Sequence, residues 1–349
     1  MTPSDTRMPN PRRPDGRHRH GVLSVISAVA ALTIACSGGG GTTRSADERQ
    51  AAPEATPANS LPSLESLQVP SPEQASSHAD TERKTGETRA PSPGTAEGIE
   101  ARALQAAELY DAGKSAEAER VYGELLKQHP DHVGSLVGMA QILIDRDELD
   151  GAGALIERAL KANPESSPAL QKKVAWLLAR DRSTEAVSVA ETAVRLNPKS
   201  AAVQKALGDA QRSFGDLPKA IAAYRAAVGL NPDWAPGWLR LGEALSENGD
   251  AAEAQAALAK ALERNPESYP AYRALARLYF DNGQPGEAVN AWGRALRQPP
   301  ERGEAHEGMA EALLAARRPA EARRHAEEAR RLGRNVDALL QQIARASNP

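Results

Sequence analysis

Residues 235–268 read APGWLRLGEALSENGDAAEAQAALAKALERNPES, and this stretch decides the fold. Its first half carries large apolar residues at the spacing of one helical face, at Trp238, Leu241 and Leu245. The run Asn-Gly-Asp at 248–250 then interrupts the helix, and a second apolar stripe follows at Ala254, Leu258, Ala261 and Leu262. Pro266 ends that stripe, because proline cannot continue an α-helix. The stretch predicts a hairpin of two short helices.

The hairpin recurs along the chain with a period of 34 residues. Six prolines keep this step, at Pro130, Pro164, Pro198, Pro232, Pro266 and Pro300, and so do seven alanines, at Ala118, Ala152, Ala186, Ala220, Ala254, Ala288 and Ala322. Small residues recur where the two helices are expected to cross, at Gly208, Gly242, Ala276 and Ala310 in the first helix. One unit copied in this way indicates a stack in which each copy buries its apolar face against its neighbours.

Trp238, Leu241, Gly242, Ala254, Leu258, Ala261 and Pro266 resemble the tetratricopeptide repeat pattern at its own spacing. The resemblance implies an all-α fold, a right-handed α-solenoid of seven 34-residue helical hairpins plus a C-terminal capping helix, preceded by a disordered linker. Hairpins one to seven are expected at 99–132, 133–166, 167–200, 201–234, 235–268, 269–302 and 303–336, with the capping helix and tail at 337–349. Hairpin three departs from the pattern at Lys173 and Val174, which predicts a one-residue shift or a local distortion there.

The chain ahead of the repeats has a different composition. Residues 36–98 are dominated by Ser, Pro, Thr, Ala, Gly and Glu, and every aromatic residue of the chain lies between Tyr110 and Trp292. Such a segment lacks the apolar surface that folding needs, so we expect a disordered tether.

Residues 1–35 have the pattern of an export signal. Arginines precede a 15-residue uncharged apolar run at 21–35, and the sole cysteine, Cys36, follows directly. The junction resembles a bacterial lipoprotein signal, although Thr33 stands where leucine is usual. It implies diacylation of Cys36, anchorage in the cell envelope, and, with Ser37 next, the outer membrane facing the periplasm. Cleavage nearby with Cys36 incidental, or an uncleaved anchor, are the other interpretations.

Several classes of function are disfavoured. The formal net charge of −3 argues against a nucleic-acid binder. No catalytic, cofactor-binding or metal-ligating motif stands out: Gly113-Lys114-Ser115 lacks the first glycine of a phosphate loop, and the seven histidines show no metal spacing. Arginines crowd hairpin seven, but Glu321, Glu327 and Glu328 are interleaved with them, so pairing on a solvated surface is expected, and docking to anionic lipid or polysaccharide is the alternative. We therefore predict no enzyme, no cofactor, no metal and no small-molecule substrate.

The resemblance places a binding groove on the concave wall, lined by the first helix of each hairpin. Its expected lining is apolar at one end and charged, with cations in excess, at the other: Val137, Gln141, Ile144, Leu178, Lys172, Lys205, Asp209, Arg212, Arg240, Glu243, Arg273 and Arg277. Such a groove suits a protein or peptide partner with apolar anchors and carboxylates, whereas a solvated, unoccupied wall is the plain alternative.

These patterns together predict a non-catalytic, envelope-tethered scaffold that binds protein partners in envelope assembly, secretion or pilus-type complexes. The alternative from another class is a polysaccharide-export or biosynthesis subunit whose groove guides an anionic glycan. Glycan binding through exposed charges is expected to weaken steeply with salt, and binding through apolar contacts is not.

Overall fold

The computed structural model describes residues 60–67, 95–298 and 302–347, and the described part is all-helical. A 3-10 helix, η1 (Leu64–Leu67), precedes fifteen α-helices. Their bounds are α2 Ala96–Asp111, α3 Ser115–Gln128, α4 Val133–Asp145, α5 Leu149–Ala162, α6 Ser167–Ala179, α7 Ser183–Leu196, α8 Ala201–Phe214, α9 Leu217–Leu230, α10 Ala235–Asn248, α11 Ala251–Arg264, α12 Tyr269–Asp281, α13 Pro285–Ala295, α14 Gly303–Ala315, α15 Pro319–Arg331 and α16 Asp337–Ser347. The predicted export signal at 1–35 and Cys36 lie outside the described residues.

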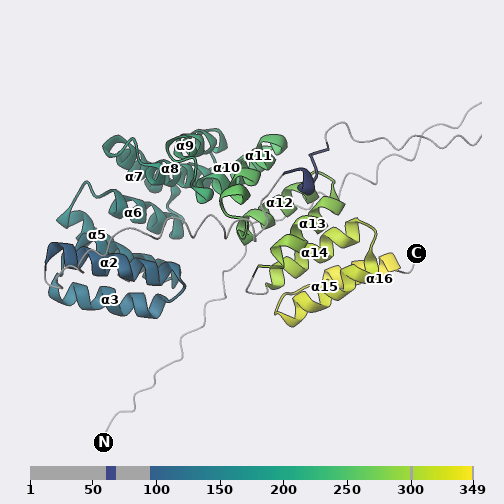
Figure 1. Cartoon of the computed structure of the whole chain (residues 1–349), viewed down its shortest axis with the longest axis horizontal. Helices are drawn as coiled ribbons and strands as arrows, with labels where there is room; N and C mark the ends of the chain where they lie inside the picture. The colour runs from purple at the N-terminus through teal and green to yellow at the C-terminus, as the bar shows by residue number, and fades with distance from the viewer. Residues whose placement is uncertain (1–59, 68–94, 299–301, 348–349) are drawn as a thin grey trace, which may run out of the picture. The chain divides into compact units, whose positions relative to one another are not determined.

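Consecutive helices pack as pairs, from α2 with α3 to α14 with α15, and each pair contacts the next (Figure 1). The seven predicted hairpins are therefore present. The first helices of neighbouring hairpins also touch, from α2 with α4 to α12 with α14, so they form one continuous wall. The capping helix α16 closes the stack by packing on α15 and α14, with Ile343 only 1% exposed.

The turn inside each hairpin is set by one residue in the left-handed region. Gly113, Gly215, Gly249 and Gly283 occupy this place in hairpins one, four, five and six, with φ between 72° and 94°. Asp147, Asp181 and Arg317 occupy it in hairpins two, three and seven, with φ of 64°, 56° and 59°. A helix that ends in this conformation reverses the chain within a few residues, and glycine adopts it without steric cost.

The turn between hairpins is built by the Asn-Pro pair and a residue that caps the next helix. The Asn163 side-chain oxygen accepts a hydrogen bond from the Glu165 amide at 3.1 Å, and Asn265 accepts one from Glu267 at 3.2 Å. Serines then cap α6, α8 and α12, because their hydroxyls accept from the backbone amides of Ala169, Val203 and Ala271. The capping residues therefore recur with the 34-residue period at the starts of these three helices.

Small residues make the helix crossings close. All seven alanines of the 34-residue register are 0% exposed. A Cβ atom added to Gly208 would lie 2.5 Å from the ring of Tyr224, and one added to Gly242 would lie 2.6 Å from the Cγ of Leu258. The glycine of the first helix therefore makes room for a large residue of the second, and tight packing leaves no space for a longer side chain.

Hairpin three keeps the register that its sequence placed in question. Helix α6 begins at Ser167, the predicted first residue, and no shift occurs. Val174 stands where hairpins four and five have glycine, but its counterpart in the second helix is Ala190 instead of Tyr224 or Leu258. Both residues are buried in one apolar cluster. Hairpin three thus places the large residue of the crossing in the first helix and the small one in the second, with the same number of side-chain carbon atoms as Gly242 and Leu258 of hairpin five.

Helix α2 begins three residues before the predicted start at residue 99. The hydroxyl of Thr95 accepts a hydrogen bond from the Gly98 amide at 3.1 Å, which caps the helix there.

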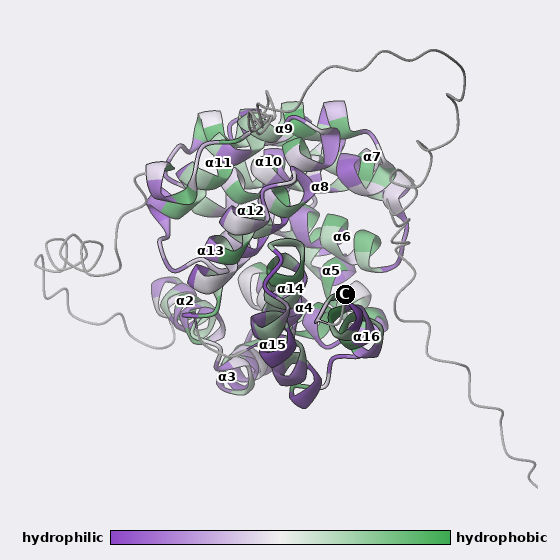
Figure 2. Cartoon of the chain, turned by 90° about the vertical axis from the view of Figure 1, so that its right-hand side faces the viewer, coloured by the Kyte–Doolittle hydropathy of each residue, from purple (hydrophilic) through white to green (hydrophobic). Residues whose placement is uncertain are grey.

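Helix amphipathicity is visible along the whole stack, and α15 is the most hydrophilic in appearance (Figure 2). Its arginines pair locally, with ion pairs that join Arg318 to Glu321 and Arg323 to Glu327.

Residues 60–67 differ from the expectation of a disordered tether over 36–98. This docked segment, which includes η1, lies against α13 beside α12 (Figure 1). Leu61 and Leu64 are each 7% exposed and belong to the apolar cluster of hairpins four to seven. The composition of the surrounding sequence predicts disorder, but two leucines three residues apart are enough to bury one face of a short turn.

Candidate functional site

The predicted groove residues come from first helices that touch one another, so the fold brings them onto one wall. Pairs across neighbouring helices recur at two sequence separations. Arg212 bonds to Glu243, and Arg273 to Glu304, across 31 residues, whereas Arg212 and Glu247 are 35 apart. The separation of 31 residues is one 34-residue period minus three, and the separation of 35 residues is one period plus one. The paired side chains therefore lie on the same face of neighbouring first helices.

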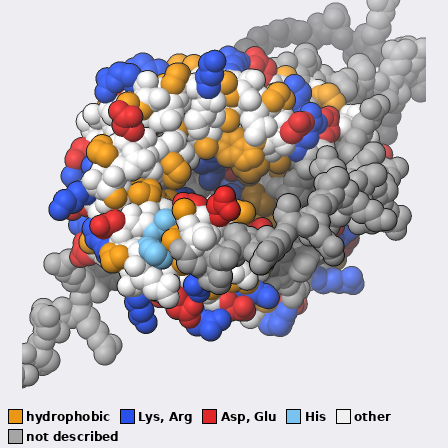
Figure 3. Space-filling view, turned by 60° about the vertical axis from the view of Figure 1, so that its left-hand side comes forward, with side chains coloured by type: hydrophobic (Ala, Val, Ile, Leu, Met, Phe, Trp, Pro, Cys, Tyr) orange, Lys and Arg blue, Asp and Glu red, His pale blue; other side chains and the backbone are white. Residues whose placement is uncertain are grey.

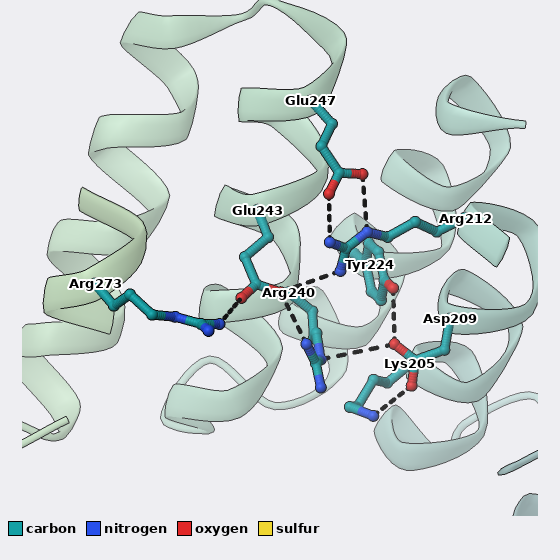
Figure 4. A network of polar contacts seen from close by, with 8 residues as sticks. All are labelled: Lys205, Asp209, Arg212, Tyr224, Arg240, Glu243, Glu247 and Arg273. Atoms are coloured by element: carbon teal, nitrogen blue, oxygen red, sulfur yellow. Dashed lines mark hydrogen bonds and ion pairs between the residues drawn. The ribbon is translucent and has the colours of Figure 1, made fainter. Parts of the chain in front are cut away.

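Eight side chains form a charged network at the centre of this wall (Figure 4): Lys205, Asp209, Arg212, Tyr224, Arg240, Glu243, Glu247 and Arg273. At one end, the Asp209 carboxylate accepts hydrogen bonds from the Lys205 ammonium at 2.5 Å and from the Tyr224 hydroxyl at 2.7 Å. The Arg240 guanidinium approaches the same carboxylate at 3.8 Å. Asp209 thus ties the hairpin crossing at Tyr224 to the groove wall.

Glu243 is the second hub of the network. Its side chain is 11% exposed and it accepts hydrogen bonds from Arg240 at 2.8 Å and from Arg212 at 3.1 Å. The guanidinium of Arg273 lies 3.9 Å away. Arg212 also forms a two-nitrogen contact with Glu247, and this bidentate geometry is the strongest that an arginine makes with a carboxylate.

Burial and neighbouring charges shift the pKa values of Tyr224 and Arg212 in this network. Burial raises the pKa of Tyr224 well above its ordinary value, and the Asp209 carboxylate raises it further. Burial alone would lower the pKa of Arg212, but the hydrogen bond and the charges of Glu247 and Glu243 raise it overall.

The predicted excess of cations is offset by two carboxylates that the sequence interpretation did not include. Glu247 pairs with Arg212, and Glu304 pairs with Arg273 at 3.2 Å. Lys205, Arg240 and Arg273, three of the cations expected to line the groove, each pair with a carboxylate of this chain. The two separations of 31 and 35 residues were the signal that identifies such partners.

Lys172 is a half-buried cation of the wall that lacks an ion pair of this kind. Its ammonium donates to the neutral side-chain oxygen of Gln141 at 2.6 Å, and no ion pair joins it to a carboxylate within the described residues. Burial lowers the pKa of Lys172; the charges of Asp145 and Asp111 oppose this effect, and the charge of Lys205 acts with it. A half-buried ammonium without a direct counter-charge favours an anion beside it.

The apolar end of the predicted groove is partly core. Val137 is 7% exposed and packs in a cluster with Leu136, so it does not line a surface. Ile144 and Leu178 are half-buried and remain accessible on the wall. Arg277 is exposed at the far end of the wall. Burial of Asp281 raises the pKa of that carboxyl group, and the positive charge of Arg277 opposes this rise. Figure 3 shows a face on which hydrophobic side chains gather about a hollow, with charged residues of both signs around it.

Outside the charged network, the contacts of one histidine have a local structural role. His132 caps α4, because its Nδ1 accepts from the Ser135 amide at 3.2 Å, while its Nε2 lies 3.0 Å from Glu100. The described residues contain no cluster of three or more side chains suited to hold a metal ion. Among the helices described, none combines the length and the apolar character needed to cross a membrane.

Comparison with solved structures identifies proteins of the same fold. A chain of the APC/C hetero-tetramer Cut9-Hcn1 superposes with a TM-score of 0.62 at 17% sequence identity, over 72% of this chain and 51% of that one. A tetratricopeptide repeat protein from Parabacteroides merdae gives a TM-score of 0.50 at 15% identity, over 72% of this chain and 99% of that one. This chain therefore spans about half the length of the first protein. No curated protein sequence gives a significant match.

Sequence profiles described as tetratricopeptide repeat match the chain in overlapping stretches. One profile matches residues 109–177, 212–279 and 245–298, and a second matches 177–233 and 273–337. The matched stretches run without a gap through the helices that build the hairpins and the groove wall. The periodic prolines and alanines, the paired helices and these profiles agree, and the chain belongs to the tetratricopeptide repeat family.

Proposed function

We propose that this protein is a non-catalytic scaffold, tethered in the cell envelope, whose groove wall binds an acidic segment of a protein partner. The tetratricopeptide repeat fold is one that mediates protein–protein interaction. The observation that carries the proposal is Lys172, the groove cation whose direct partner is the neutral Gln141. A carboxylate from a partner reaches this ammonium without breaking an ion pair of the chain, whereas at Arg212 or Arg240 it must displace one.

The surroundings of Lys172 suit a peptide more than a simple anion. Ile144 and Leu178 are half-buried on the same wall, in the helices that precede and contain Lys172. A segment with one acidic residue near apolar residues therefore fits this part of the wall. Because the ammonium is already partly desolvated, the new ion pair gains more than a pair formed at an exposed site.

The test uses a photo-crosslinking residue in place of Leu178, with the partner identified from envelope fractions. Binding of the isolated partner is then measured to the wild-type chain and to Lys172→Glu. We expect at least a tenfold loss of affinity, because a carboxylate of the chain would repel the partner's own. Lys161→Glu, an exposed change of the same charge on α5, is the matched control and is expected to bind as the wild type does. Equal affinity of all three chains contradicts the groove proposal.

Internal pairing bears on the alternative of an anionic glycan. Four cations of the network, Lys205, Arg212, Arg240 and Arg273, each hold a carboxylate of this chain, which leaves little unbalanced positive charge along the wall for a polyanion. A protein segment is therefore favoured. If a glycan is the ligand, affinity should fall steeply between low and physiological salt, because screening weakens contacts between exposed charges.

The envelope location is part of the proposal and is supported by sequence alone: the basic start, the apolar run at 21–35 and Cys36. Two acyl chains supply stable anchorage where one does not. Cys36→Ala should move the protein from the membrane fraction to the soluble periplasm and leave its helical circular dichroism unchanged. Equal membrane retention of the two chains would instead indicate an uncleaved signal.

A further inference from the structure

The docked segment at residues 60–67 is held by hydrogen bonds to its backbone. The Gln284 side chain binds both backbone groups of Leu61: its Nε2 donates to the Leu61 carbonyl at 2.8 Å, and its Oε1 accepts from the Leu61 amide at 2.9 Å. The Pro62 carbonyl accepts from the Gln255 Nε2 at 2.7 Å and from the Tyr279 hydroxyl at 3.0 Å. The Leu64 amide donates to the Glu287 carboxylate at 2.9 Å. Each of these hydrogen bonds joins a backbone group of the segment to a side chain that lies about two hundred residues later in the sequence.

The side chains that bind the segment do not make the local contacts that their counterparts make in other hairpins. Gln284 is the N-cap residue of α13, yet its side chain does not cap that helix. In the corresponding places of hairpins three and seven, Arg182 pairs with Glu185 and Arg318 pairs with Glu321. In hairpin six, Gln284 and Glu287 both bind the docked segment instead. The side-chain Nδ2 of Asn282 donates to the Gln284 Oε1 at 3.0 Å, which fixes the orientation of the Gln284 side chain.

Two further polar groups depend on the segment. Gln255 is 2% exposed and Tyr279 is 0% exposed, and their polar atoms bond to each other at 2.9 Å as well as to the Pro62 carbonyl. Gln255 stands on α11 at a place where hairpins three, four and six carry Val187, Ile221 and Val289. A buried glutamine at an otherwise apolar position is costly unless it has a partner, and here the partner is the segment.

The segment adds selectivity through its side chains. Leu61 and Leu64 enter the apolar cluster that contains Ala254, Leu258 and Ala288. Pro62, between them, has no amide hydrogen and so leaves no donor without a partner at that point. The site thus requires two leucines three residues apart and tolerates a proline after the first.

We propose that Gln255, Tyr279, Gln284 and Glu287 form a peptide-binding site for the pattern Leu-Pro-x-Leu, and that residues 60–67 of the same chain are its resident ligand. The site lies apart from the groove wall, and its assignment is independent of the proposed groove partner. Covalent linkage gives the resident segment an effective concentration of about millimolar order, so a separate peptide binds only when the segment is unseated.

The test measures binding of a fluorescent peptide of residues 60–67, SLPSLESL, to the full chain by anisotropy. Leu61→Asp/Leu64→Asp unseats the resident segment and leaves the site intact, so this variant should bind the peptide at least tenfold more tightly than the wild type does. A peptide with both leucines changed to alanine is the control for nonspecific contact and should not bind. No saturable binding to the variant, or equal binding of the control peptide, overturns the proposal.

A second measurement does not depend on the unseated variant. Hydrogen exchange at the Leu61 and Leu64 amides should be slowed in the wild-type chain, since both donate to the site. Gln284→Ala should speed exchange at Leu61 at least tenfold while the circular dichroism of the repeats stays unchanged. Unprotected amides in the wild type overturn the proposal. A dimer that dissociates in Leu61→Asp/Leu64→Asp overturns the assignment to the same chain.

Discussion

Hairpins three and four share one backbone path but reach it with different residues. Hairpin four crosses its helices with Gly208 against Tyr224, and hairpin three uses Val174 and Ala190 at the same two places. The larger residue of the crossing therefore lies in the second helix of hairpin four and in the first helix of hairpin three. Tyr224 also extends its hydroxyl to Asp209, so in hairpin four the crossing supports the charged network, and Ala190 has no polar group that could do so. The comparison teaches that either helix of a hairpin can supply the large residue of the crossing, so the identity of that residue is free for function.

The strongest test of this comparison truncates the large residue. Tyr224→Ala should lower the free energy of unfolding of the central hairpins by about 3–5 kcal/mol, because it leaves a cavity at the crossing. Adding Gly208→Val should recover about 1 kcal/mol or more, since it imports the arrangement of hairpin three. Native-state hydrogen exchange measures the local free energies. Strict additivity of the two changes would show that volume is not exchanged across the crossing.

A change at the common alanine tests what the two hairpins share. Ala186 and Ala220 occupy the same place, and both are 0% exposed. Replacing either with leucine should lower stability by about 1–3 kcal/mol, because neither crossing has space for the extra atoms. Ala226→Leu, an exposed change on the same helix as Ala220, is the control and should be close to neutral. A tolerated leucine in hairpin three alone would mean that its crossing is looser than that of hairpin four.

The smallest expected effect lies in the turns. Asp181 has φ of 56° where hairpin four has Gly215 at 94°. Asp181→Gly should stabilise hairpin three by about 0.5–1 kcal/mol, because the left-handed conformation strains a residue with a Cβ atom. Gly215→Asp should destabilise hairpin four by a similar amount. Thermal unfolding of both variants checks the opposite signs, and two shifts in the same direction would refute the explanation.

The hairpin register was predictable because its signals are periodic. Proline, glycine and alanine act through the backbone and through contacts inside one hairpin, so a single sequence suffices to place them. The start of α2 was missed by three residues because Thr95 lies before the first repeat, where no earlier copy marks the boundary.

The charged network was predicted only in part. The groove positions were read one helix at a time, which identified Asp209 and Arg212 but omitted Glu247 and Glu304. Those partners follow from a rule between helices, namely separations of 31 and 35 residues. The docked segment could not be predicted from local pattern, because Leu61 meets Gln284 across 223 residues and its neighbours in sequence carry no period.

The docked segment also determines how the protein carries a mechanical load. A pull on the chain ahead of residue 60 enters the solenoid at hairpins five and six, through the hydrogen bonds to Leu61, Pro62 and Leu64, and bypasses hairpins one to four. When those bonds yield, the force passes to Thr95 at the start of α2. The covalent reach of the chain between Leu67 and Thr95, at most on the order of 100 Å at about 3.5 Å per residue, limits how far the loaded chain can lengthen at this step. We therefore expect the segment to detach under load before any hairpin unfolds.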